Sequence, residues 1–471
     1  MKNISLFLFV CVFPALTFCQ NNNPVLTIAG GKVIGVETPT KGVIAYKGIP
    51  FAAPPLGDLR WKEPQPVIPW DGIKVAGTFG AAAEQVTWDP ESFYGKEWRA
   101  SGSVPFSEDC LYLNIWTPAA GQVNKKLPVA MWIHGGGYRE GFAFEPEMDG
   151  GEEWASRGVI LVSVTYRLGV IGFFSHPLLS AESAHKVSGN YGLLDQAAAL
   201  KWIHDNIEQF GGDPNNITIF GQSAGGGSVQ SLCASPLSKN FISHAISMSA
   251  GGLGNFKLIS KLDSALSVNK DFMDYFKKTS LKEMRALSFK ELTQMAKDYA
   301  DATKKRMFWG PVVDGYVLPG SFSDEATAGH IPDIPYMFGY TTNDLMDMTN
   351  AVKDFCALRA EKSKQPAYAY LFARQLPGDK SGAFHSSDLW YVFHSYAHSW
   401  RPFTAGDKAL SNTIVEYYTN FAKYGNPNGA SGNAWTPFST AVHNFMVLDA
   451  NENETMCKMT DTPIYKGNAF K

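Results

Sequence analysis

Short apolar runs alternate with longer amphipathic stretches along the chain, and this alternation predicts an α/β fold. An apolar run over 129–133 ends in three glycines, and a second run over 159–164 follows it. Such runs are expected of neighbouring strands that are buried on both faces. Apolar residues recur at helical spacing over 193–210, and a short strand is predicted at 217–220.

The later part of the chain adds strands and a helical region. Residues 336–339 and 368–372 are predicted to be the last strands of the sheet. Residues 257–306 mix Lys, Asp and Glu with Leu, Met and Phe and contain no Pro, which predicts exposed helices that form a wall or cap beside the sheet. The pattern as a whole predicts a large, mostly parallel central sheet flanked by helices.

Composition agrees with one large buried core. Hydrophobic residues make up 45% of the 471 residues and charged residues 18%, a balance that excludes disorder for most of the length. No linker, repeat or charge block divides the sequence, so residues 20–471 are predicted to form a single domain. The formal net charge of −3 leaves no basic surplus for phosphates, which argues against a nucleic-acid partner.

The N-terminal residues have the pattern of a secretory signal peptide. Lys2 precedes an apolar run over 4–16, and cleavage is predicted after Cys19, so that residues 1–19 are removed. The run is too short to span a bilayer, and no later stretch offers about 18 uninterrupted apolar residues. These features predict a secreted or periplasmic protein without a transmembrane segment. A lipid anchor on Cys19 is a less favoured alternative, because bulky Phe18 precedes it.

A Gly-Gln-Ser-Ala-Gly sequence at 221–225 directly follows the strand predicted at 217–220 and precedes a helix of small residues. A sharp turn at this point lifts the serine oxygen away from the backbone, and the flanking glycines remove Cβ atoms that would clash. Ser223 is therefore the candidate nucleophile. The new helix points its N-terminus at the site, where the N–H of Ala224 can stabilise an oxyanion.

A second glycine motif, His-Gly-Gly-Gly, begins at His134 directly after the strand predicted at 129–133. Motifs of this type supply oxyanion donors, because glycine lets the backbone approach the substrate oxygen closely. Gly136 and Gly137 are the predicted donors. His134 is expected to orient the loop rather than to act as a base.

A serine nucleophile needs a base and a carboxylate that fixes the imidazole tautomer, and in this setting they follow in the order serine, acid, histidine. The histidines that satisfy this order are His385, His394, His398 and His443. His385 is the predicted base because it lies in a small, polar loop after the strand predicted at 368–372. His394 and His398 lie in an aromatic-rich stretch suited to core packing.

Two carboxylates compete for the role of the acid. Asp344 and Asp347 both follow the strand predicted at 336–339. Asp344 is preferred because it closes the turn over 339–344, and Asp347 remains the alternative.

These motifs belong to a longer series that resembles the type-B carboxylesterase family, the cholinesterase-like branch of the α/β-hydrolases. The resemblance runs from about Val33 to Tyr465. Besides the two glycine motifs, the matching stretches are Tyr-Lys-Gly-Ile-Pro-Phe-Ala at 46–52, Leu-Gly-Asp-Leu-Arg-Trp at 56–61, Ser-Glu-Asp-Cys-Leu-Tyr-Leu-Asn at 107–114, Gly-Asn-Tyr-Gly-Leu-Leu-Asp-Gln at 189–196 and Phe-Ala-Lys-Tyr-Gly-Asn-Pro at 421–427.

The resemblance implies an α/β-hydrolase fold and a serine esterase that uses the residues named above, with neither cofactor nor metal. The family usually carries Glu at the position of the acid, whereas this chain has the shorter Asp344. The resemblance also implies two buried ion pairs, Arg60 with Glu108 and Arg167 with Asp195.

Other departures from the family pattern bear on redox state and substrate. Ala83 stands where many relatives carry the disulfide partner of Cys110, so Cys110 is expected to be a free, buried thiol. Gln222 stands where cholinesterases carry Glu, which disfavours a choline ester. The interval between Asp344 and His385 is shorter than in most relatives, so part of the wall over the acyl pocket is expected to be missing.

The sequence therefore predicts a carboxylic ester hydrolase that acts on a small-molecule ester and is broad for neutral esters. An esterase specialised for acylated carbohydrates, such as acetyl or hydroxycinnamoyl esters, is the alternative. A non-catalytic binding or adhesion relative is less favoured, because such relatives typically lack part of the catalytic set. Neither a dinucleotide-binding glycine motif after a strand nor a cluster of His and Cys ligands is present in the sequence. The sequence contains no signal for an oligomeric state.

Overall fold

The computed structural model describes residues 23–87, 89–98, 104–144, 150–254, 259–428 and 434–470. The predicted signal peptide, with Cys19, lies outside these residues. Within the described ranges, no helix is both long and apolar enough to cross a bilayer.

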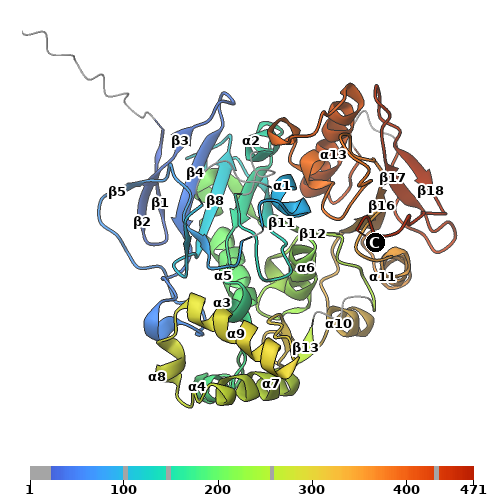
Figure 1. The fold of residues 1–471 in the computed structure, drawn as a ribbon. Coiled ribbons are helices and arrows are strands. Elements are labelled where there is room, and N and C mark those ends of the chain that lie inside the picture. Colours follow the sequence, from blue (N-terminus) through green and yellow to red (C-terminus); the bar gives the residue numbers. More distant parts are fainter. Residues whose placement is uncertain are drawn as a thin grey trace, which may run out of the picture.

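An eleven-stranded sheet runs through the centre of the molecule (Figure 1) in the order β18-β17-β16-β15-β12-β11-β9-β10-β8-β4-β3. Neighbouring strands from β10 through β17 are parallel, and the pairs at both edges are antiparallel. The large, mostly parallel sheet and the α/β-hydrolase fold are therefore confirmed. Parallel strands place their carboxyl ends on one edge, which is where this class of fold carries its functional loops.

The strands of this sheet are β3 (Val36–Glu37), β4 (Ile44–Pro50), β8 (Tyr112–Thr117), β9 (Leu127–Ile133), β10 (Ile160–Val164), β11 (Gly212–Gln222), β12 (His244–Met248), β15 (Tyr336–Thr341), β16 (Ala367–Phe372), β17 (Phe445–Leu448) and β18 (Lys458–Thr460). Smaller sheets are formed by β1 (Val25–Ile28), β2 (Gly31–Ile34) and β5 (Ile73–Val75), by β6 (Ala82–Ala83) with β7 (Phe106–Ser107), and by β13 (Ser260–Lys261) with β14 (Val312–Val313).

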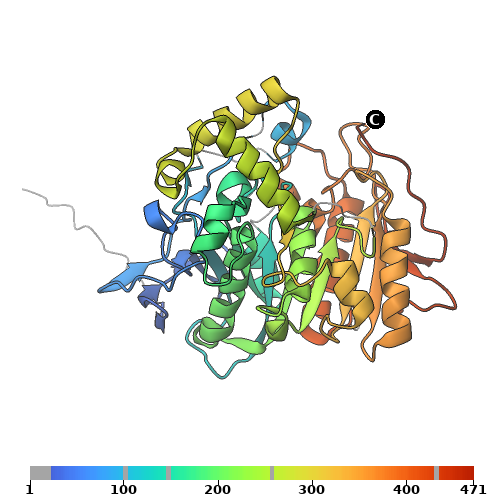
Figure 2. The same ribbon diagram turned by 90° about the horizontal axis from the view of Figure 1, so that it is seen from below.

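Helices cover both faces of the sheet (Figures 1 and 2). The first face packs against α3 (Gly169–Phe173), α5 (Tyr191–Asn206), α6 (Ala224–Ala234), α10 (Phe322–Ala328) and α11 (Thr349–Lys362). The second face packs against α2 (Gly151–Ser156), α12 (Leu389–Val392) and α13 (Ala405–Tyr424). Along β9, Met131 and Ile133 join the first core and Ala130 and Trp132 join the second, so a central strand is apolar on both faces.

Several predicted boundaries change in the structure. The helix predicted at 193–210 begins at Tyr191 and becomes a 3₁₀ helix over Ile207–Phe210, which ends at Gly211 with a φ of +83°. The prediction that β15 and β16 are the last strands is wrong, because β17 and β18 extend the sheet beyond them. Both added strands are only three or four residues long, too short for hydrophobic periodicity to distinguish them from loops.

The predicted helical region contains α7 (Leu262–Tyr275), α8 (Leu281–Arg285) and α9 (Phe289–Thr303). They lie together beside α4 (Pro177–Glu182) at the lower end of Figure 1. Ser280 with Glu283 and Ser288 with Glu291 form capping boxes at the starts of α8 and α9. These boxes satisfy backbone N–H groups that a helix start leaves without partners.

Ion pairs attach the helical region to the sheet domain. The guanidinium of Arg60 contacts Glu108 and also donates to the backbone oxygen of Arg285, 3.0 Å away. Arg285 in turn donates to the backbone oxygen of Arg60 at 3.0 Å and pairs with Glu182. The predicted pair of Arg60 and Glu108 is thus confirmed, with Arg60 buried and Glu108 nearly so, and Arg60 also fixes the position of α8.

The second predicted pair is buried more deeply. The side chains of Arg167 and Asp195 are both fully inaccessible to solvent, and two hydrogen bonds of 2.8 and 2.7 Å join them. Removing one partner from such a pair leaves an uncompensated buried charge, which costs about 3–5 kcal/mol. The pair therefore holds α5 against the loop after β10.

Cys110 is a free, buried thiol, as the absence of its usual partner predicts. Cys233, Cys356 and Cys457 are also buried, and none of them forms a disulfide with a described residue. We expect treatment with a reductant to leave the melting temperature and activity unchanged, because these cysteines offer no disulfide to reduce. Loss of a native disulfide would instead commonly lower the free energy of unfolding by about 2–5 kcal/mol. Thermal unfolding with and without reductant checks this, together with mass mapping of the thiols. A disulfide between Cys110 and any of the other three would contradict it.

Candidate active site

Loops after four strands from the parallel part of the sheet meet at its carboxyl edge. The loop after β9 carries the glycine triplet, and the turn after β11 carries Ser223. Asp344 follows β15, and His385 follows β16. Residues that are far apart in the sequence are brought together because these strands run in the same direction within one sheet, with only β12 between β11 and β15.

Ser223 sits between β11 and α6 in a strained conformation, with a φ of +58° and a ψ of −124°. The turn is possible only with glycine on either side. A Cβ atom on Gly221 would lie 2.5 Å from the backbone of Gly225, and one on Gly225 would lie 2.0 Å from the backbone oxygen of Ile133. Backbone strain of this kind persists only where the surroundings hold it, and it is characteristic of active sites.

Three backbone N–H groups are available next to Ser223. Gly136 has a φ of +92°, and Ala224 is the first residue of α6, where a helix leaves its N–H groups without intrahelical partners. Within the described part of the chain, the N–H groups of Gly136, Gly137 and Ala224 have no hydrogen-bond acceptor. They are the donors that an oxyanion would need.

Buried groups hold the glycine loop in place. His134 is inaccessible to solvent and its ring stacks on Tyr166, with centroids 4.4 Å apart. Burial lowers the pKa of His134 to about 4, so the imidazole stays neutral. On the far side of the loop, the side-chain amide of Gln85 bonds to both the N–H and the oxygen of Gly141, at 2.8 and 2.9 Å. No sequence pattern indicates this role of Gln85, because its partner is the backbone of Gly141.

His385 and Asp344 are in direct contact, with His385 Nδ1 2.6 Å from Asp344 Oδ1. Asp344 is fully buried and also accepts hydrogen bonds from the N–H groups of Thr341 and Leu345, at 3.1 and 2.8 Å. Burial raises the pKa of Asp344, but attraction to His385 and the hydrogen bonds that it accepts outweigh burial and lower that pKa below its usual range. The carboxylate therefore stays ionised and can orient the imidazole.

The competing residues lie elsewhere. Asp347 is exposed and accepts a hydrogen bond from the N–H of Thr349 at the start of α11. His394 is half-buried and bonds to Ser411, whereas His398 is exposed, so the expectation that both pack in the core is only partly met. His443 stacks on the ring of nearby Phe438, with centroids 5.7 Å apart.

Gln222 makes a contact that sequence reasoning missed. Its Nε2 lies 3.2 Å from Nε2 of His385, whereas Ser223 Oγ has no hydrogen bond to any described residue. When His385 donates its Nδ1 proton to Asp344, its Nε2 is an acceptor, and the amide of Gln222 can donate to it. In the free protein the amide thus satisfies the imidazole nitrogen that a serine nucleophile would need.

A second buried carboxyl lies close to the first. Asp388 is 1% exposed, its Oδ2 accepts a 3.4 Å hydrogen bond from the hydroxyl of Tyr370, and its Oδ1 has no partner among the described residues. Burial and repulsion from Asp344 raise the pKa of Asp388 to about 7. Below about pH 7, Asp344 is therefore ionised whereas Asp388 is mostly protonated, and only Asp344 contacts the imidazole.

A cavity of about 210 Å³ opens above Ser223. Tyr94 and Trp98, from α1 (Phe93–Glu97) and its end, form one wall, and Leu345 and Leu389 contribute apolar surface. The hydroxyl of Tyr94 donates to the backbone oxygen of His385 at 3.2 Å. No described residue of 259–306 lines this cavity, so these helices form no part of its described wall.

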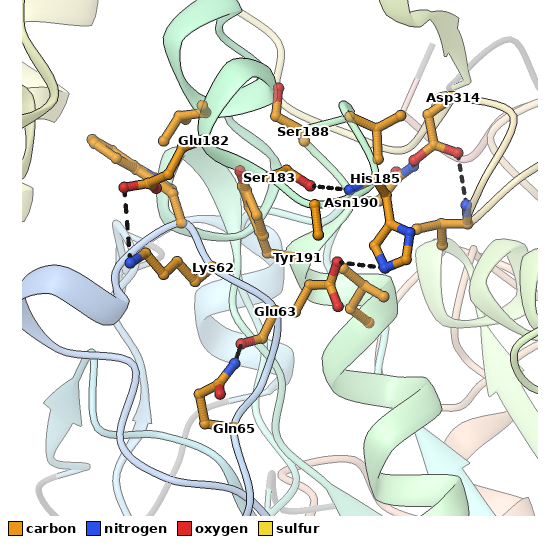
Figure 3. Close-up of a pocket in the computed structure, with 17 residues that line it drawn as sticks. Lys62, Glu63, Gln65, Glu182, Ser183, His185, Ser188, Asn190, Tyr191 and Asp314 are labelled. Carbon is orange, nitrogen blue, oxygen red and sulfur yellow. Dashed lines mark hydrogen bonds and ion pairs between the residues drawn. The ribbon is translucent and has the colours of Figure 1, made fainter.

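A larger cavity, of about 240 Å³, lies away from Ser223 between the segment after Trp61, α4 and the turn at Asp314 (Figure 3). Its charged side chains mostly face one another. Lys62 lies 3.8 Å from Glu182, and His185 lies 3.7 Å from Glu63. These pairs neutralise one another, so they do not indicate a site for a charged ligand. The candidate nucleophile and base, Ser223 and His385, line the smaller cavity. Elsewhere too, the described residues hold no group of three His, Cys, Asp or Glu arranged to bind a metal ion.

Comparisons with known proteins agree with this geometry. The carboxylesterase family profile matches residues 22–355 and 347–464. The chain is 37% identical over 356 residues to the fumonisin B1 esterase of Sphingopyxis macrogoltabida, a match that covers 74% of this chain and 62% of that protein. It is 31% identical over 485 residues to the para-nitrobenzyl esterase of Bacillus subtilis, covering 90% of this chain and 95% of that protein.

Solved structures extend the similarity to the fold. A thermophilic para-nitrobenzyl esterase superposes with a TM-score of 0.78 at 29% identity, over 92% of this chain and 97% of that one. A carboxylesterase of Geobacillus stearothermophilus gives a TM-score of 0.76 at 27% identity, with the same coverage. The chain therefore belongs to the type-B carboxylesterase family of carboxylic ester hydrolases.

Proposed function

We propose that the chain is a serine esterase that hydrolyses carboxylic esters through an acyl-enzyme on Ser223, with His385 as the base and Asp344 as the acid. The observation that carries this proposal is the 2.6 Å contact between His385 and Asp344 beside a serine held at positive φ. The three unoccupied backbone donors support it. A non-catalytic relative is disfavoured, because nucleophile, base and acid are all present.

The proposed reaction follows from the positions of the protons. With Nδ1–H donated to Asp344, Nε2 of His385 accepts the proton of Ser223 as its Oγ attacks the ester carbonyl. Gly136, Gly137 and Ala224 donate to the oxygen of the tetrahedral intermediate. The imidazolium then gives its proton to the leaving alcohol, and a water activated by His385 releases the acid from the acyl-enzyme. The amide of Gln222 must give up Nε2 of His385 for the first step.

Labelling tests the proposal directly. An organophosphonate that carries a good leaving group should form one covalent adduct, which peptide mapping should locate on Ser223. Hydrolysis of a panel of esters that differ in acyl length and alcohol should stop in proportion to labelling. An adduct on another serine, or activity that survives complete labelling of Ser223, would contradict the assignment.

We also propose export to the periplasm or the cell exterior, which the signal-like residues 1–19 support. The remaining residues 20–471 would then form the mature domain. Intact mass of protein isolated from its native cells tests this, because cleavage after Cys19 yields a chain beginning at Gln20 and a lipid on Cys19 yields a heavier one.

The proposed substrate range is broad for neutral esters and includes bulky alcohols. The names of the two relatives given above refer to two different esters, fumonisin B1 and a para-nitrobenzyl ester. This difference supports an active site that accepts varied esters. An acylated carbohydrate is the second candidate, supported by Tyr94 and Trp98 on the cavity wall, since aromatic rings present apolar faces to bulky groups. Comparison of sugar acetates with simple alkyl acetates in the ester panel separates these two.

We expect kcat/KM for a choline ester to be no higher than for its neutral isostere with a tert-butyl head. A carboxylate beside the nucleophile would favour the cation by about 4 kcal/mol at 4 Å and an effective dielectric constant near 20, and neutral Gln222 provides no such attraction. Steady-state kinetics with a fixed acyl group measure the ratio. A preference for choline above about 30-fold would contradict this expectation, because it needs about 2 kcal/mol of selective transition-state binding.

A further inference from the structure

The guanidinium of Arg139 lies beside one of the proposed oxyanion donors. A Cβ atom placed on Gly137 would lie 3.6 Å from Nε and 3.7 Å from Nη2 of Arg139. Arg139 also lines the cavity that contains Ser223 and His385. A fixed positive charge therefore stands within reach of groups attached to the ester carbonyl.

Among the described residues, this charge has no ion-pair partner. Arg139 is exposed, and no carboxylate of the described residues forms an ion pair or a hydrogen bond with it. Arg60, Arg167 and Arg401, by contrast, each hold a buried or nearly buried carboxylate. Arg139 thus differs from the arginines that stabilise the fold.

The nearest acidic side chain in the cavity does not cancel this charge at mildly acidic pH. Glu140 lines the same wall, with its Cγ 3.0 Å from the place of a Cβ on Gly136. Burial, only partly opposed by Arg139, raises the pKa of Glu140 to about 7. Besides these two residues, the only titratable groups on the described wall are His385, which is paired with Asp344, and the phenol of Tyr94, whose pKa burial raises.

We propose that Arg139 is a specificity-determining residue that favours esters carrying a carboxylate a few bonds from the scissile carbonyl. This inference rests on the proposed ester hydrolysis at Ser223 and names a substrate class within it. A guanidinium offers a planar pair of N–H donors that matches a carboxylate, and it stays charged at all working pH values. Neutral esters react at the same site without this contact.

Matched pairs of esters test the proposal. With the carboxylate on the acyl side, para-nitrophenyl hydrogen glutarate is compared with its neutral terminal amide, after subtraction of spontaneous hydrolysis. With the carboxylate on the alcohol side, para-carboxyphenyl acetate is compared with para-carbamoylphenyl acetate. At pH 6, we expect kcat/KM to be about tenfold higher for the anionic member of at least one pair, and the side that responds locates the carboxylate.

Variants assign the preference to Arg139. Arg139→Gln should abolish the preference while changing kcat/KM for the neutral esters by less than about threefold, and Arg139→Lys should retain part of it. Glu140→Gln should keep or increase it. Arg306→Gln is the matched control, because Arg306 is exposed and lies outside the cavity. Added salt should weaken the preference, as for any exposed charge pair.

Other outcomes overturn the inference. An equal loss on anionic and neutral esters in Arg139→Gln would assign Arg139 to the oxyanion or to loop structure instead. The same loss in Arg306→Gln would assign the preference to the overall charge, and equal rates for both members of each pair in the unmodified protein would remove it. Failure to hydrolyse any ester, with no label on Ser223, would be a failure of the proposed function and is distinct from all three.

Discussion

Replacing Ser223 by Ala is expected to lower kcat for ester hydrolysis by about 10⁴-fold or more, with a much smaller change in KM. The alanine removes the atom that would form the acyl-enzyme, whereas the cavity walls and the backbone donors that bind the ester remain. Ala224 would still begin α6, and the contact between His385 and Asp344 does not involve the serine. Steady-state kinetics on a para-nitrophenyl ester, with circular dichroism to verify the fold, measure the effect.

Exposed Ser264 on α7 provides the control for this substitution. Ser264→Ala should keep kcat within about twofold, because the residue is exposed and does not line the cavity. A Ser223→Ala protein that is folded and still releases para-nitrophenol in an exponential burst would show that another residue forms the covalent intermediate.

Much of this site could be predicted because its chemistry depends on local backbone geometry. The glycines around Ser223, together with Gly135 and Gly136, are required by contacts shorter than 3 Å, and Gly137 is required by its φ of +64°. Such requirements leave a mark on the sequence. The position of the nucleophile after a strand is likewise a local property. The order of acid and histidine along the chain then restricts the candidates to a few.

Contacts between distant side chains left no such mark. The sequence shows Gln222 next to the nucleophile, but its contact with His385 depends on how β11 and β16 sit in one sheet. In the sequence, Asp388 cannot be distinguished from an exposed polar loop residue, because its burial is a property of the folded structure. The short strands β17 and β18 were missed for a related reason, since their pairing and not their periodicity defines them.

Replacing Asp344 by Asn is expected to lower kcat by about 10⁴-fold while keeping the fold at neutral pH, because the amide supports the wrong imidazole tautomer. The N–H groups of Thr341 and Leu345 reach different oxygens of Asp344, so the single oxygen of an asparagine can accept only one of these hydrogen bonds, and it presents no charge to the imidazolium that forms during attack. Asp347→Asn is the matched control and should leave kcat nearly unchanged, since Asp347 is exposed and bonds to the start of α11. If Asp347→Asn proves the damaging change, Asp344 is not the acid.

The pH dependence of stability distinguishes this role from a merely structural one. The pKa of Asp344 is lowered in the folded protein, so its ionisation stabilises the fold at pH values above the ordinary aspartate value of about 3.9. That contribution is lost as the pH falls through the lower, folded value, because the native carboxylate must then take up a proton. Asp344→Asn lacks the titrating group, so the difference in unfolding free energy between the unmodified protein and the variant should shrink on acidification below about pH 4. Denaturant unfolding at pH 7 and pH 3 measures it, and a difference that stays constant would mean that Asp344 is not held as the ionised partner of His385.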